Sequence, residues 1–197
     1  MFEKAVIYAT NAHNGQTRKG TNLPFIIHPM EVAAIVAAMT LDQDMLCAAV
    51  LHDVVEDCDG ISIEDIRREF GDIVASYVYQ ESEDKSKTWV ERKGHTIDFL
   101  KNRASRNAKI IALGDKLANI RALYRDYNIL GEELWERFNM KDKKMQSWYY
   151  RGMIEGFADL SEFHEYEEYC QLVNESFSLK SNTKEKKTDF ANIVKCL

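Results

Sequence analysis

The chain contains only two prolines, Pro24 and Pro29, and both fall in one short segment. Proline breaks helices and is excluded from the middle of a sheet, so the long stretches on either side of this segment are free to form unbroken helices. Strict alternation of apolar and polar residues, the pattern of a half-buried strand, is hard to find. Apolar residues recur instead at helical spacing. The sequence therefore predicts an all-α fold.

Capping residues and glycines divide the chain into a series of expected helices. Gly15 supplies a left-handed stop for the first helix, and Pro29 suits the first turn of the second. Asp42 or Asp44 should cap the third, which carries residues 52–57. The first and second helices span residues 2–13 and about 29–39. After the third, the expected helices span residues 62–70, about 72–80, 89–103, 105–127, 131–138, 142–158 and 160–177, and loops are expected at 15–27 and 81–87.

Length and local composition suggest one domain followed by a tail. A chain of 197 residues is long enough for a single domain with a sizeable core, and we assign residues 1–178 to it. Residues 180–187 are polar and basic, which favours a linker. Apolar residues in 188–197 favour a short amphipathic helix. Residues 179–197 are therefore expected to form a polar linker and a short amphipathic tail.

Charge and cysteine usage restrict the class of protein. A formal net charge of -6 gives no sign of a nucleic-acid-binding surface. No apolar stretch has the length of a membrane span, and the first residues lack the pattern of a signal peptide. The four cysteines show no paired spacing. Reduced thiols in a cytoplasmic protein, with no nucleic-acid or membrane partner, are the simplest interpretation, and the oligomeric state stays open.

Four ionisable side chains are crowded into six residues directly after an apolar run: His52, Asp53, Glu56 and Asp57. In a continuous helix, positions i and i+4 share a face, so the imidazole and the carboxylates would converge. Like charges at that distance repel unless a cation or shared protons compensate, which favours a functional cluster. The alternative interpretation is a solvated acidic helix end.

Two further residues complete a candidate metal site. His28 lies beside Pro29, at a rigid loop-to-helix junction. Asp115 and Asn119 are four residues apart, on a different face of their helix from its apolar stripe, which makes them poor core residues. The expected donor set consists of two imidazoles and two carboxylates: His28, His52, Asp53 and Asp115. Such a set suits Mn²⁺, with Fe²⁺, Zn²⁺ and Mg²⁺ as alternatives.

The order of these motifs resembles the HD superfamily of metal-dependent phosphohydrolases. More narrowly, residues 3–157 look like the hydrolase domain of RelA/SpoT homologues, which removes pyrophosphate from the alarmone (p)ppGpp. The stretches that carry the resemblance are Ala12-His13-Asn14-Gly15-Gln16-Thr17-Arg18-Lys19, Pro24-Phe25-Ile26-Ile27-His28-Pro29, Leu51-His52-Asp53-Val54-Val55-Glu56-Asp57, Ser82-Glu83-Asp84-Lys85 and Leu113-Gly114-Asp115-Lys116-Leu117-Ala118-Asn119-Ile120-Arg121.

The resemblance implies an HD-domain helical bundle and a stand-alone small alarmone hydrolase, because the chain ends without room for a synthetase domain. The ion held by the four ligands would polarise a phosphoryl oxygen and lower the pKa of a water molecule. Glu56 and Asp57 are expected to orient and deprotonate that water, with metal ligation as their competing role. Gly114 stands where the family usually has alanine, a change expected to alter packing only.

The resemblance also implies substrate contacts. Arg18 and Lys19 are expected to lie against the base, where a planar guanidinium can stack, and Asn119 is expected to hydrogen-bond the nucleotide near its sugar. Tyr149 is a candidate for lining the nucleoside pocket. The charged loop and the helix after it offer cations for the polyphosphate: Lys85, Lys87, Arg92 and Lys93. Solvated surface cations are the alternative interpretation for the loop lysines.

Three functions are compatible with these sequence features. The leading expectation is Mn²⁺-dependent hydrolysis of (p)ppGpp at its 3′-pyrophosphate, which yields pyrophosphate and GDP or GTP. A rival within the same class is hydrolysis of (p)ppApp or another nucleotide phosphate ester. A rival of a different class is a non-catalytic nucleotide-binding regulatory module. The intact set of ligands, together with Glu56 and Asp57, argues against the last.

Overall fold

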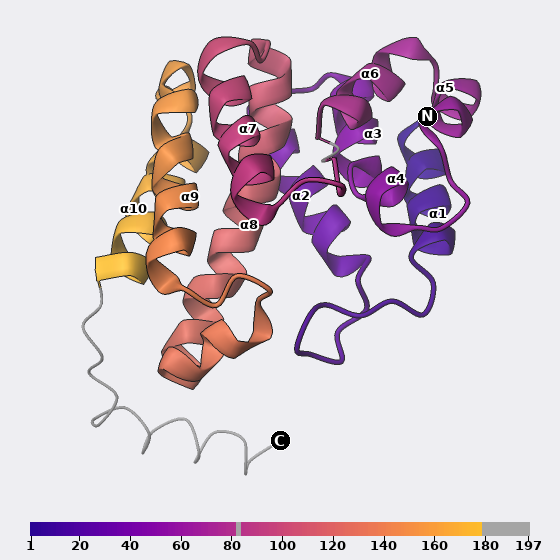
Figure 1. The fold of residues 1–197 in the computed structure, drawn as a ribbon. Helices are drawn as coiled ribbons and strands as arrows, with labels where there is room; N and C mark the ends of the chain where they lie inside the picture. Colours follow the sequence, from indigo (N-terminus) through magenta and orange to yellow (C-terminus); the bar gives the residue numbers. More distant parts are fainter. Residues whose placement is uncertain (82–83, 179–197) are drawn as a thin grey trace, which may run out of the picture.

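A computed structural model describes residues 1–81 and 84–178, and the elements assigned within these ranges are helical (Figure 1). The exception is one isolated antiparallel bridge between Thr17 and Pro24. The all-α prediction is therefore confirmed. The α-helices are α1 (Phe2–Ala12), α2 (Ile27–Met39), α3 (Gln43–Leu51), α4 (Val54–Asp57), α5 (Ile63–Phe70), α6 (Asp72–Glu81), α7 (Trp89–Asn102), α8 (Arg106–Leu130), α9 (Lys143–Gly156) and α10 (His164–Ser178).

The helix ends follow the capping chemistry of the sequence. Asp42, not Asp44, caps α3, and its side chain accepts hydrogen bonds from the backbone N–H groups of Asp44 and Met45. Ser62 and Asp65 form a reciprocal capping box at the start of α5. The segment expected as a helix at 131–138 forms the tighter 3₁₀ helix η1 (Gly131–Arg137), and a second short one, η2, spans Ala158–Leu160.

The long helix α8 lies between two groups of helices (Figure 1). Helices α1 to α6 lie on one side, where α2 packs along α8 and α3 packs against both. Helices α7, α9 and α10 lie on the other side. Fully buried side chains such as Val32 on α2 and Leu117 on α8 fill the space between the helices, and each contributes about 1.5–3 kcal/mol through burial. The packed core thus holds α2, α3 and α8 against one another.

One expected feature is wrong: residues 43–57 do not form a continuous helix. Helix α3 ends at Leu51, and α4 begins at Val54 after a turn at His52 and Asp53. Both turn residues keep right-handed backbone angles. The His52 side chain bonds back to the carbonyl of Ala49 at 2.8 Å, a local alternative partner of the kind that competes with regular helix bonding. The simple i, i+4 picture of the cluster therefore does not apply.

Helices α2 and α8 approach closely at Gly114, one residue before Asp115. A Cβ atom added to Gly114 would lie 2.7 Å from Cγ2 of Val36 and 3.4 Å from the carbonyl oxygen of Val32. Val36 is fully buried and β-branched, so it has little freedom to move aside. The glycine therefore sets the separation of the two helices that carry His28 and Asp115.

We expect Gly114→Ala to destabilise the fold by about 1 kcal/mol. Overpacking of a full core costs about 1–3 kcal/mol, and this exceeds the gain in helix propensity of about 1 kcal/mol or less. The matched control is Gly94→Ala in α7, where the added Cβ would meet only a ring atom of Trp148, at 3.9 Å. Urea unfolding should show a loss for the first variant and a small gain for the second. Equal gains in both would contradict the close approach.

The expected linker and tail at residues 179–197 lie outside the described residues, so the predicted domain boundary stays a prediction. Within the described part of the chain, no helix combines the length and the apolar character needed to cross a membrane.

Candidate active site and metal centre

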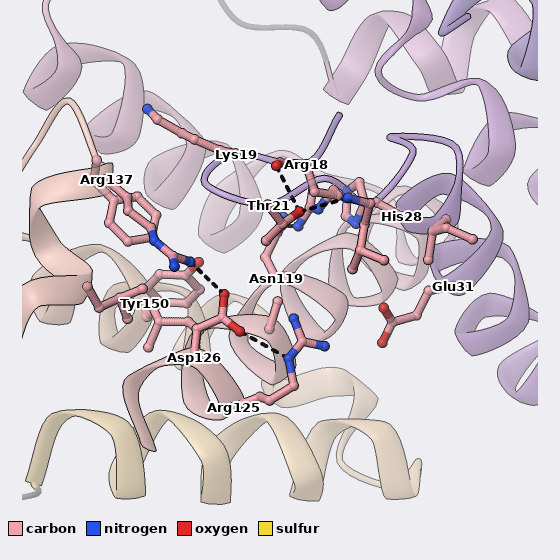
Figure 2. Close-up of a pocket in the computed structure, with 16 residues that line it drawn as sticks. Arg18, Lys19, Thr21, His28, Glu31, Asn119, Arg125, Asp126, Arg137 and Tyr150 are labelled. Carbon is pink, nitrogen blue, oxygen red and sulfur yellow. Dashed lines mark hydrogen bonds and ion pairs between the residues drawn. The ribbon is translucent and has the colours of Figure 1, made fainter. Parts of the chain in front are cut away.

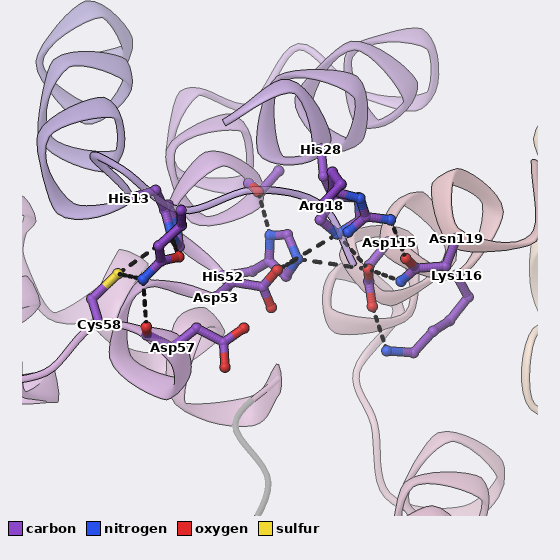
Figure 3. Close-up of polar contacts among 12 residues, drawn as sticks. His13, Arg18, His28, His52, Asp53, Asp57, Cys58, Asp115, Lys116 and Asn119 are labelled. Atoms are coloured by element: carbon purple, nitrogen blue, oxygen red, sulfur yellow. Dashed lines mark hydrogen bonds and ion pairs between the residues drawn. The ribbon is translucent and has the colours of Figure 1, made fainter. Parts of the chain in front are cut away.

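Four side chains from three parts of the chain meet between α2, the α3–α4 turn and α8 (Figure 3). The Nε2 atom of His28 lies 3.1 Å from Oδ1 of Asp115 and 3.5 Å from Oδ2 of Asp53. The Nε2 atom of His52 lies 3.1 Å from the same Asp53 oxygen and 3.6 Å from the same Asp115 oxygen. The structure therefore brings together all four residues expected as metal ligands.

The local fold orients these donors. Pro29 fixes the backbone beside His28 in the first turn of α2. The carbonyl of Ala49 can only accept a hydrogen bond, so Nδ1 of His52 is its donor. In the neutral imidazole the proton then sits on Nδ1, and the Nε2 lone pair faces the carboxylates, as in metal sites where a backbone carbonyl sets the tautomer.

Opposite charges dominate the electrostatics of the cluster. Burial by itself lowers the pKa of His52, but the charge of Asp53 and hydrogen bonds with Asp115 and Asp53 raise it well above its usual value. Burial likewise favours the neutral form of Asp115, yet the neighbouring Lys116 ammonium and the two imidazoles hold the pKa of Asp115 well below its usual range. Asp115 therefore stays ionised in a nearly dry environment.

The donor set fits a divalent cation. One ligand atom each from His28, His52 and Asp53 lies within 4.8 Å of the others, and Asp115 adds a second carboxylate at the distances given above. With the imidazoles neutral and Nε2 unprotonated, the facing atoms of the cluster are all acceptors, so their convergence favours a cation between them. Asn119 donates to Asp115 Oδ1 at 2.6 Å and helps to hold that carboxylate in place.

Glu56 and Asp57 lie on the short helix α4, directly after the turn. The carbonyl of Asp57 accepts a hydrogen bond from the Gln16 side chain at 2.8 Å, which ties α4 to the loop after α1. The ammonium of Lys85 donates to the carbonyl of Glu56 at 2.6 Å and to Oδ1 of Asp57 at 3.2 Å. The acidic pair thus lies between the candidate ligands and a lysine of the charged loop.

Beside the cluster is a cavity of about 240 Å³, which we call the metal-site cavity. Its lining includes the four candidate ligands, both acidic residues of α4, and cations from α7 and α8. Of the four cations predicted to contact the polyphosphate, Arg92 and Lys93 of α7 are in this lining, whereas Lys85 and Lys87 are not. The cavity therefore combines a candidate metal site, candidate bases and positive charge.

Two lining residues were missed from the sequence. Glu81 was expected in the charged loop, but it ends α6 and lines the metal-site cavity. Burial raises the pKa of Glu81 to about 7, against the opposing Lys116 charge. Lys116 follows Asp115 and contacts its Oδ2 atom. The position of Lys116 next to a candidate ligand was a signal in the sequence that could have been used. Nothing in the sequence around Glu81 distinguished it from its charged neighbours.

A second cavity of about 260 Å³, the outer cavity, lies alongside α8 (Figure 2). Arg18, His28 and Asn119 line both cavities, so the two are adjacent. The Arg18 guanidinium donates to Oδ1 of Asn119 at 3.0 Å. Lys19 also lines the outer cavity. The residues expected at the base and the sugar are thus next to the metal-site cavity.

The structure does not place Tyr149 in the lining of either cavity. Its ring packs against Trp89 and Tyr150, with the Lys93 ammonium 4.8 Å from the ring centroid. The neighbouring Tyr150 lines the outer cavity instead. Adjacent residues on a helix point about 100° apart, so the sequence alone did not decide which of the two tyrosines faces the cavity.

The helical fold and the cluster of histidines and aspartates are those of a known class of protein, the HD domain. A family model described as an HD domain matches residues 5–133. The chain belongs to the HD-domain family.

Two relatives of the chain are named as 3′-pyrophosphohydrolases. The chain is 40% identical over 125 residues to the guanosine-3′,5′-bis(diphosphate) 3′-pyrophosphohydrolase MESH1 of Drosophila melanogaster, a match that covers 62% of this chain and 69% of that protein. It is also 40% identical over 127 residues to a guanosine-3′,5′-bis(diphosphate) 3′-pyrophosphohydrolase of Vibrio cholerae. That match covers 62% of this chain but only 18% of the longer Vibrio protein.

Two solved structures share the fold. One is a metazoan orthologue of SpoT, described as hydrolysing ppGpp and acting in starvation responses, with a TM-score of 0.74 and 28% identity. That match covers 91% of this chain and 96% of the other. The second, lmo0812 from Listeria monocytogenes, has a TM-score of 0.70 and 31% identity, and covers 77% of this chain and 99% of the other. The helical arrangement is therefore that of HD-domain proteins.

Proposed function

We propose that this chain is a divalent-metal-dependent hydrolase that removes pyrophosphate from the 3′ position of (p)ppGpp. The observation that carries the proposal is the buried cluster of two imidazoles and two carboxylates, which opens onto a cavity lined by an acidic pair and several cations. Relatives whose names state this activity support the choice of substrate.

The ion would be held by His28, His52, Asp53 and Asp115, and when bound it supplies Lewis-acid activation of the phosphoryl group and of water. Mn²⁺ is the ion we propose, because mixed nitrogen and oxygen donors suit it. Asp115 stays ionised for this role because Lys116 and the imidazoles lower its pKa.

The chemical step is in-line attack of water on the phosphorus linked to the 3′ oxygen. Glu56 and Asp57 orient the water and accept its proton. The bond between that phosphorus and the ribose 3′ oxygen breaks, so pyrophosphate carries away the oxygen of water and the 3′ oxygen leaves with a proton. Lys85, which already contacts both acidic residues, holds them in place and offers charge to the pyrophosphate.

Substrate binding is assigned to residues that line the two cavities. Arg18 and Lys19, which line the outer cavity, would lie against the base, and Asn119 would hydrogen-bond near the sugar. Arg92 and Lys93 of α7 face the metal-site cavity, where they balance the charge of the polyphosphate.

The test is to incubate the protein with Mn²⁺ and, separately, with ppGpp, ppApp, cyclic nucleotides and nucleoside triphosphates, and to identify the products. We expect ppGpp to yield pyrophosphate and GDP, and chelation of the metal to stop the reaction. Turnover confined to ppApp would reassign the base. Turnover of cyclic nucleotides alone, or of nothing in the panel, would reject the proposal.

A further inference from the structure

Helix α8 presents a row of residues that runs from the metal site into the outer cavity. Asp115, Asn119, Ala122 and Asp126 are spaced i, i+4, i+7 and i+11, which places them on one face of the helix. Asn119, Ala122 and Asp126 all line the outer cavity. At 1.5 Å per residue, Asp126 lies about 16 Å along the helix from Asp115. A nucleotide bound along this face, with its reacting phosphate at the metal, would direct its base towards Asp126.

Asp126 is held rigidly in the outer cavity by two arginines (Figure 2). Its Oδ2 atom accepts a hydrogen bond from the Arg137 guanidinium at 3.1 Å, and its Oδ1 atom one from Nε of Arg125 at 3.0 Å. The side chains of Asp126 and Arg137 are 18% and 27% exposed. The carboxylate is therefore largely shielded from solvent and held by two hydrogen bonds.

The loop after α1 packs directly onto Arg137. A Cβ atom on Gly20 would lie 2.6 Å from Cδ of Arg137, and the positive φ of 74° at Gly20 is one that glycine adopts readily. The same loop carries Arg18 and Lys19 into the outer cavity. The outer cavity thus offers Arg18 as a planar cation for stacking and, at its far wall, a donor and an acceptor side by side.

Two adjacent acceptor oxygens with a donor beside them match guanine better than adenine. Each carboxylate oxygen of Asp126 uses one lone pair on an arginine and keeps another free, and a guanidinium carries five N–H donors. The Watson–Crick edge of guanine presents one acceptor, O6, followed by two donors, N1–H and the N2 amino group. Adenine presents a donor at N6 and an acceptor at N1. Guanine can therefore donate two parallel hydrogen bonds to the two Asp126 oxygens while its O6 accepts one from Arg137. Adenine has a single donor on this edge, so it leaves one of the two oxygens without a hydrogen bond.

We propose that Asp126, positioned by Arg137, reads the base by accepting hydrogen bonds from the Watson–Crick edge of guanine, and so selects guanine over adenine nucleotides. The inference rests on the proposed function for the direction in which the nucleotide lies. It adds a residue that sets specificity at the end of the cavity opposite the chemistry.

The test compares the affinities for GDP and ADP, which differ only in the base, by calorimetry without metal. The wild-type protein should prefer GDP. Asp126→Asn replaces one carboxylate oxygen with an amide NH2 group, which donates instead of accepting. It should reduce the ratio of GDP affinity to ADP affinity by roughly 10- to 100-fold. Arg137→Lys keeps the charge but loses the planar fork, and should also reduce it, which provides a second variant should the first fail to fold.

Glu31→Gln is the matched control, because Glu31 is a carboxylate in the same cavity on α2, paired with Arg121. It should change both affinities alike and leave their ratio intact. An unchanged ratio in Asp126→Asn, a wild-type protein with no preference for GDP, or binding of neither nucleotide would overturn the assignment. Binding is measured without turnover, so a failure of ppGpp hydrolysis would reject the proposed function separately.

Discussion

Asp53→Ala is expected to abolish hydrolysis of ppGpp and to lower metal affinity by more than about 100-fold. Loss of a residue that only hydrogen-bonds to a metal ligand typically lowers metal affinity 10- to 100-fold. Asp53 should matter more, because it contributes an oxygen that faces both imidazoles. Metal content per chain, measured on the purified protein, should fall from about one ion to none. Residual turnover should lie at the level of the uncatalysed reaction.

A stability measurement gives an independent readout of the same change. A cation at 100 times its dissociation constant stabilises the folded state by about 2.7 kcal/mol, which corresponds to roughly 5–10 °C in a domain of this size. Mn²⁺ should therefore raise the melting temperature of the wild-type protein and leave that of Asp53→Ala unchanged. Asp59→Ala, an exposed carboxylate outside the metal-site cavity, is the control. If Asp53→Ala binds the metal as tightly as the wild-type protein, Asp53 is not a metal ligand.

Glu56→Gln and Asp57→Asn are expected to lower kcat by about 10²- to 10⁴-fold while metal affinity stays within a few-fold of the wild-type value. This is the usual contribution of a group that transfers a proton in the transition state. Each substitution keeps the size of the side chain and removes its ability to accept a proton. Steady-state kinetics with ppGpp, alongside a metal titration of the same samples, measures both quantities.

The competing role predicts the opposite pattern. If either residue is a metal ligand, its substitution lowers metal affinity, and saturating Mn²⁺ restores a large part of the rate. Asp59→Asn makes the same chemical change two residues after Asp57, at an exposed position, and should leave both rate and affinity unaltered. Rates near the wild-type value in both active-site variants would show that neither side chain takes the proton.

Much of the fold was predictable because helix signals are local. Caps and stops lie within a few residues of the bonds they form, so Asp42, Ser62 and Gly71 place helix boundaries without knowledge of the rest of the chain. Helical periodicity likewise separated the face of α8 that packs in the core from the face that carries Asp115. The exceptions were the interrupted helix at His52, where a side chain competes with the backbone, and the tighter winding at 131–137.

The candidate ligands were also accessible from the sequence, since only a few residue types bind divalent ions and the ordered set is much more specific than any one member, such as His28 alone. The sequence by itself determined the helical class and the inventory of donors. The tertiary structure alone decided that these four side chains converge, that Glu81 and Lys116 join them, and that Tyr150 lines the outer cavity rather than Tyr149. It also decided that Arg137 meets both Asp126 and the loop at Gly20. Contacts between distant segments depend on how helices pack and rotate about their axes, and no short stretch of sequence contains that information.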